Sequence, residues 1–86
     1  MNANLIRVNL EKHMDRRYSV VVQPTLLDPL AVVCVWGSRR GSYQRARAYP
    51  VPTTAEARKL AEKIVRTKVR RGYVLAQVLD NAHAEI

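Results

Sequence analysis

Residues 53–72 carry the one clear helical pattern of the chain, and this pattern constrains the fold more than any other feature. Thr53 can cap a helix, Glu56 can reach back to it from three residues on, and Gly72 suits a left-handed cap at the other end. Between the caps, apolar residues recur at helical spacing: Ala57, Leu60, Ala61, Ile64, Val65 and Val69. A helix with one apolar stripe has to bury that stripe against another element.

Two alternating stretches typical of half-buried strands come first in the chain. In residues 4–10 the apolar side chains that share a face are Ile6, Val8 and Leu10. In residues 16–23 they are Tyr18, Val20 and Val22. The polar residues 11–15 lie between the two stretches, so the sequence predicts a hairpin with its turn there.

Three further segments complete a predicted sheet. Residues 31–36 form a near-continuous apolar run, which suits a central strand covered on both faces. Residues 43–49 alternate again, and residues 73–79 resemble a short final strand. The sequence therefore predicts an α+β fold: a small antiparallel sheet of about four to five strands with one amphipathic helix packed on one face.

The chain length of 86 residues is that of one small domain. We expect a single domain over residues 1–86, with its core in about residues 4–79 and a frayed tail in about residues 80–86. No apolar stretch reaches the length of about 20 residues that a bilayer span needs, and charges come too early for a secretory signal. We therefore expect a cytoplasmic protein that does not contact a membrane.

The charge is strongly basic: 15 Lys and Arg face 7 Asp and Glu, for a net charge of +8. The cations concentrate in two stretches without any acid, residues 29–55 and 63–79. Such an excess points to a polyanionic partner, although net charge by itself describes non-specific attraction and not a site.

The stretch "VWGSRRGSYQ" combines an aromatic residue with this charge. Trp36 ends the apolar run, where its ring either caps the core or stacks on a base or sugar at the surface. Gly37 and Gly41 allow a tight turn, and the guanidiniums of Arg39 and Arg40 at its tip suit phosphate oxygens. An ordinary hairpin turn with solvated arginines is the alternative interpretation.

The sequence offers little for catalysis. His13 and His83 have no neighbouring ligands at metal-site spacing, and no nucleophile or phosphate-loop motif is present. Cys34 lies in the apolar run and is expected to be a buried, inert thiol. We expect a protein that is not an enzyme and that uses no cofactor, metal or small-molecule substrate.

The order "RRYSVVVQPTLL", "VVCVWGSRRGS" and "AYPVPTTAEARKLAEKIVRTKVRRGY" resembles the WGR domain family over about residues 4–76. Its most specific pieces are Trp36-Gly37, the turn ending in Gly41-Ser42, the helix start at Glu56-Ala57, and the closing segment from Lys68 to Gly72-Tyr73. The chain is similar to stand-alone bacterial members and to the WGR domain of poly(ADP-ribose) polymerases. There the domain binds DNA at strand breaks, and its motif tryptophan and arginine lie against the backbone and end nucleotide.

The resemblance departs at the third motif residue, which is Ser38 here, so Arg39 or Arg40 takes the arginine's place only if a longer turn shifts a guanidinium there. It implies a nucleic-acid-binding module, foremost for duplex DNA held through phosphates and at ends or nicks. Binding of single strands or RNA is a variant, which exposed rings of Trp36, Tyr43 and Tyr49 would favour. The alternative is an interaction module whose basic face docks an acidic protein. The candidate DNA-binding residues are Trp36, Gly37, Arg39, Arg40, Arg45, Arg47, Lys68, Arg70, Arg71 and Tyr73.

Overall fold

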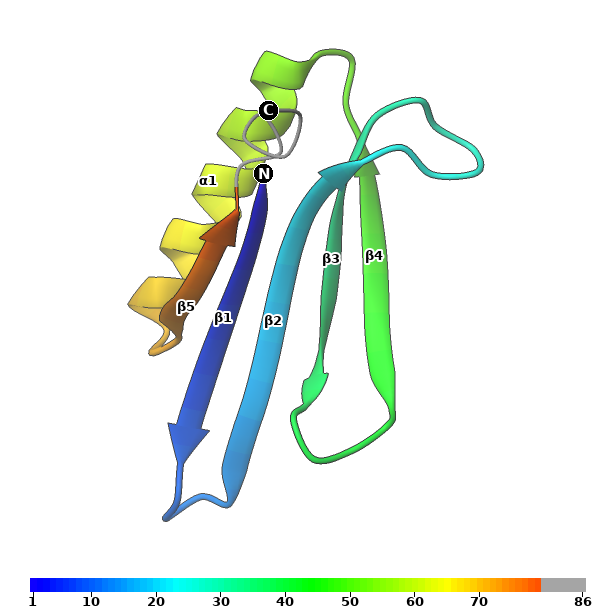
Figure 1. Cartoon of the computed structure of the whole chain (residues 1–86). Coiled ribbons are helices and arrows are strands. Elements are labelled where there is room, and N and C mark those ends of the chain that lie inside the picture. Colours follow the sequence, from blue (N-terminus) through cyan, green and yellow to red (C-terminus); the bar gives the residue numbers. More distant parts are fainter. Residues whose placement is uncertain (80–86) are drawn as a thin grey trace.

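The computed structural model describes residues 1–79 and has the predicted α+β fold. Its elements are β1 (Asn2–Asn9), β2 (Met14–Gln23), β3 (Ala31–Ser38), β4 (Gln44–Pro50), α1 (Thr54–Arg70) and β5 (Val74–Leu79). The strands form one antiparallel sheet in the order β4-β3-β2-β1-β5. Helix α1 lies across one face of this sheet, and we call the opposite face the helix-free face (Figure 1). The tail expected in residues 80–86 lies outside the described residues.

Helix α1 begins and ends as its sequence predicts. The hydroxyl of Thr53 accepts a hydrogen bond from the backbone N–H of Glu56 at 3.1 Å, which satisfies one of the unpaired donors of the first turn. After the last turn, Gly72 adopts a φ of 101°, a conformation that glycine reaches without the steric penalty of a Cβ. The chain can therefore reverse directly from α1 into β5.

The core lies between α1 and the sheet. Strand β2 is central in the sheet and contributes Tyr18 and Val20, as its alternation predicts. The other buried members of this cluster come from β1, β3 and α1: Ala3, Leu5, Val32, Cys34, Ala57 and Ala61. The burial predicted for Cys34 is confirmed. No helix within residues 1–79 is long and apolar enough to cross a membrane.

Two predictions about strand faces are wrong. In β1 the side chains under the helix are Ala3 and Leu5, whereas Ile6 and Val8 lie on the helix-free face, since Leu5 pairs with the buried Tyr18. Val8 is 51% exposed, and Leu10 beyond the strand is 80% exposed. Strand β3 is likewise not covered on both faces, because α1 packs on one side of the sheet only.

Candidate nucleic-acid interface

Three aromatic rings meet beneath the C-terminal half of α1. The ring of Tyr18 stacks on that of Trp36, with centroids 5.7 Å apart and planes at 17°. Tyr73, just beyond the helix, packs edge-on against Tyr18 with centroids 6.1 Å apart. Trp36 is half-buried, because it packs against the core cluster and also lines a surface groove. Trp36 therefore packs on the core and also reaches the surface, and its stacking on a base or sugar stays a prediction.

Lys68 adds a cation to these rings. Its Nζ lies 4.4 Å from the ring centroid of Tyr18 and 6.0 Å from that of Tyr73, within cation–π range. Burial lowers the pKa of Lys68, and the positive charge of Arg71 lowers it further. No carboxylate within residues 1–79 forms an ion pair with Lys68. Its ammonium group is thus held by aromatic faces, and its charge is not neutralised by an acid.

A groove of about 370 Å³ opens beside this cluster, and we call it the Trp36 groove. It is lined by Arg16, Trp36, Gly37, Ser38, Gly41, Tyr43, Arg45 and Tyr73. Four of the predicted site residues therefore converge on one concave surface: Trp36, Gly37, Arg45 and Tyr73. Within that lining are two guanidiniums, three aromatic rings and no carboxylate.

Strand register explains why these side chains meet. Paired residues on adjacent antiparallel strands project from the same face of the sheet. Tyr18 pairs with Trp36, and Trp36 pairs with Arg45, which makes a row of three side chains on the helix side. Arg16 is two residues before Tyr18 and therefore projects from the same face. No residue of α1 lines the Trp36 groove, so the groove lies at the end of this row that extends past the helix.

Gly37 serves a different purpose from the one its sequence suggests. It lies within β3, not in the turn, and its φ is not positive. A Cβ at this position would lie 2.7 Å from the backbone oxygen of Tyr43 on the approach to β4. Glycine is needed here because the neighbouring backbone comes too close for any side chain.

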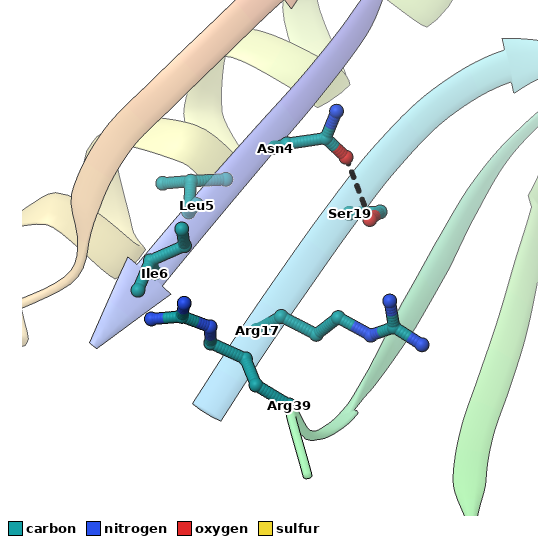
Figure 2. Close-up of a pocket in the computed structure, with 6 residues that line it drawn as sticks. All are labelled: Asn4, Leu5, Ile6, Arg17, Ser19 and Arg39. Carbon is teal, nitrogen blue, oxygen red and sulfur yellow. Dashed lines mark hydrogen bonds between the residues drawn. The ribbon is translucent and has the colours of Figure 1, made fainter. Parts of the chain in front are cut away.

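Arg39 and Arg40 do not line the Trp36 groove, contrary to the prediction that they lie beside the indole ring. Both guanidiniums contact the carboxylate of Asp15, with Arg39 Nη1 3.4 Å from Oδ1 and Arg40 Nε 3.3 Å from Oδ2. The backbone N–H of Arg39 also donates to the Asp15 carbonyl at 3.0 Å. Arg39 projects toward the helix-free face, where Figure 2 shows its side chain directed toward Ile6 of β1.

The remaining predicted cations surround the interface without lining the Trp36 groove. Arg47 pairs with Cys34 across the sheet and lies over the ring of Tyr49, with 5.1 Å from Cζ to the centroid. Arg70 and Arg71 are exposed at the end of α1. They contribute to the positive field near Lys68, and they occupy the helix end where cations are favourable.

Two groove residues, Arg16 and Tyr43, were not among the candidate DNA-binding residues, and neither was Tyr18, which stacks on Trp36 from the core. Tyr18 was assigned only to the core, and Arg16 was not singled out, although it alternates in phase with Tyr18. A signal was available, because pairing the two predicted strands brings Arg16 to the end of the strand that carries Trp36. Tyr43 required the structure, since the turn that returns it to Trp36 has no regular pattern.

The arrangement can bind an anion and a flat ring together. Arg16 and Arg45 offer bidentate donors for phosphate oxygens, and the aromatic lining suits a base or sugar. No group of three potential metal ligands occurs within residues 1–79.

Comparison with protein families agrees with this geometry. The WGR domain family matches residues 1–79, which is almost the whole chain. Comparisons with curated proteins and with solved structures give no match. A WGR domain is a binding-type module and not a catalytic one, and it is found as a nucleic-acid-binding module in poly(ADP-ribose) polymerases. Family match, fold and groove together place this chain in the WGR domain family.

Proposed function

We propose that this WGR domain binds duplex DNA through phosphates at the Trp36 groove and prefers ends or nicks. The observation that carries the proposal is the groove itself, in which Arg16 and Arg45 flank Trp36 without an opposing carboxylate. Guanidiniums in such a setting hold phosphate oxygens, and a phosphate-based contact tolerates any sequence.

The preference for ends or nicks follows from Trp36. An indole in the lining can stack on a nucleotide only where that nucleotide is not covered by its neighbour, as at the end of a duplex. Tyr18 supports the indole from within the core, so the ring is held in place before DNA arrives. Lys68, Arg70 and Arg71 extend the positive surface along the DNA backbone.

Fluorescence anisotropy of labelled duplexes, titrated at several salt concentrations, tests this proposal. If about four phosphates are neutralised, the logarithm of the affinity falls with the logarithm of salt concentration at a slope of about −4. Blunt and nicked duplexes should bind more tightly than a closed circular duplex without a nick. A slope near zero would contradict phosphate binding.

Two double variants locate the site with equal loss of charge. Arg16→Ala with Arg45→Ala removes both groove guanidiniums, and Arg39→Ala with Arg40→Ala removes the two that contact Asp15. The groove variant should lose more affinity and flatten the salt slope by about 2. Equal losses in both variants would show that DNA responds to net charge alone and would refute the groove as the site.

A further inference from the structure

The helix-free face carries apolar side chains that nothing within residues 1–79 covers. The alternation Ile6, Val8, Leu10 is of the kind that strands bury, yet it faces away from α1. Val74 of β5 pairs with Ile6 and projects beside it, and its exposed fraction is 68%. We call these four residues the aliphatic patch: Ile6, Val8, Leu10 and Val74. Val8, Leu10 and Val74 are exposed and Ile6 is half-buried. Neighbouring apolar side chains left at the surface in this way mark interaction surfaces.

Cations border the aliphatic patch. A groove of about 340 Å³ has Ile6, Arg17 and Arg39 in its lining. Figure 2 shows the Arg39 side chain directed toward Ile6 and the Arg17 side chain directed away from it. Arg17 has no ion-pair partner within residues 1–79, whereas Arg39 and Arg40 share the single carboxylate of Asp15. Three guanidiniums against one carboxylate leave this border with a net positive charge.

The floor of the groove is polar and ordered. The hydroxyl of Ser19 donates to the side-chain oxygen of Asn4 at 2.8 Å (Figure 2), and the amide of Asn4 donates to the side-chain oxygen of Gln77 at 3.3 Å. An adjoining hollow of about 190 Å³ is lined partly by Val8, Leu10 and Arg40. The surface from β5 to the β1–β2 turn thus carries both apolar and cationic side chains.

The two faces of the sheet differ in chemistry. Every aromatic side chain of the chain belongs to the helix side or the Trp36 groove: Tyr18, Trp36, Tyr43, Tyr49 and Tyr73. The helix-free face has aliphatic residues instead, which give a nucleobase no ring to stack on. Phosphates would contact the arginines but would leave Val8 and Leu10 in water. This face does not repeat the chemistry of the nucleic-acid interface.

We propose that the helix-free face docks an acidic amphipathic segment of a partner protein. Carboxylates of that segment pair with Arg17 and Arg39, and its apolar side chains cover the aliphatic patch. A second copy of this chain is disfavoured because it brings the same positive charge, with +8 on each molecule. A membrane surface is disfavoured because the patch is hollowed and lacks the aromatic residues typical of membrane interfaces. The domain then holds DNA on one face and a protein on the other.

The probe is a synthetic helical peptide of Glu, Leu and Ala with apolar residues at i, i+3, i+4 and i+7. A peptide of the same composition in scrambled order has equal charge but no apolar face. With the ¹⁵N-labelled protein, the amphipathic peptide should shift backbone resonances of β1 and Arg17 and leave the Trp36 indole unchanged. It should also bind at least about fivefold more tightly than the scrambled peptide, because it covers apolar surface that the scrambled peptide cannot.

Matched variants test the surface. Val8→Thr with Val74→Thr keeps side-chain shape and strand preference while it removes apolar contact, and should weaken peptide binding about fivefold or more. Leu26→Ser with Leu27→Ser removes two apolar residues of the β2–β3 loop that are more exposed than Val8 and Val74, and it should leave peptide affinity unchanged. Retained folding of each variant is checked by its amide spectrum.

Several outcomes would overturn the docking proposal. They are equal binding of both peptides, peptide shifts at Trp36 and Tyr73, and absence of peptide binding. If duplex DNA displaced the peptide from β1, the helix-free face would be assigned to nucleic acid. If the protein bound phosphatidylserine vesicles but not the peptide, and the Val8→Thr, Val74→Thr variant lost vesicle binding, the helix-free face would be assigned to a membrane. DNA binding is measured separately on the same samples by anisotropy. Failure of the peptide experiment therefore leaves the DNA-binding proposal standing.

Discussion

Replacing Gly37 by alanine should destabilise the fold through one identified collision. The added Cβ would lie 2.7 Å from the backbone oxygen of Tyr43, whereas ordinary contact begins at 3.4 Å. The backbone leading into β4 would therefore have to move by about 0.7 Å. Because that atom belongs to the main chain, no rotamer change can relieve the contact.

The expected loss of unfolding free energy is about 1–2 kcal/mol. Overpacking of well-filled sites costs about 1–3 kcal/mol, and β4 can relax toward the lower part of that range because it is an edge strand. For a domain of this size, the loss lowers Tm by at least about 4 °C. Urea and thermal unfolding, followed by the fluorescence of the single Trp36, measure both quantities.

Gly41→Ala, in the turn that follows β3, is the matched control. Its added Cβ would find its nearest neighbour, the Cβ of Ser38, at 3.6 Å, and the φ of Gly41 is not positive. This variant should unfold within about 0.5 kcal/mol of the parent protein. If Gly37→Ala proved as stable as Gly41→Ala, the close approach of Tyr43 would not be the reason for glycine at position 37.

Two further predictions concern stability. Burial, reinforced by a hydrogen bond to Cys34, raises the pKa of the Tyr18 hydroxyl above its ordinary 10.0, so the folded state keeps a proton that the unfolded state loses. The contribution of Tyr18 to the free energy of unfolding is complete below pH 10 and is lost as the pH rises above it. Between pH 9 and about pH 11, Tm should therefore fall less steeply in Tyr18→Phe than in the parent protein. Equal slopes would contradict the raised pKa of Tyr18. Thr53→Ala should cost about 1 kcal/mol in urea unfolding because it removes the cap of α1, whereas Thr54→Ala, within the first turn, should cost less.

The helix and the order of the elements along the chain could be predicted because their signals are local. Thr53, the apolar stripe and Gly72 define α1 through contacts within a few residues. The buried face of a strand could be predicted only where just one of its two alternating sets of side chains is apolar. In β2 the alternative set contains Arg17 and Ser19, so Tyr18 and Val20 had to face the core.

The face of β1 could not be predicted in this way, since both of its alternations contain apolar residues. The set with Ala3 and Leu5 was buried because Leu5 pairs with Tyr18, and the small Ala3 lets α1 approach the sheet. The prediction that Arg39 and Arg40 lie beside Trp36 was wrong for a similar reason, because it too depends on strand pairing. Their partner Asp15 is distant in sequence and comes close only when β2 pairs with β3.

The sequence by itself determined the elements, the fold class, the positive charge and the presence of an aromatic residue beside a basic turn. These follow from periodicity, capping and composition, which act over short stretches of chain. The tertiary structure decided which residues share a surface: Trp36 with Arg16, Arg45 and Tyr73 on the helix side, and Ile6 with Arg17 and Arg39 on the other. Strand register sets those groupings, because a shift of one residue moves every side chain of a strand to the opposite face.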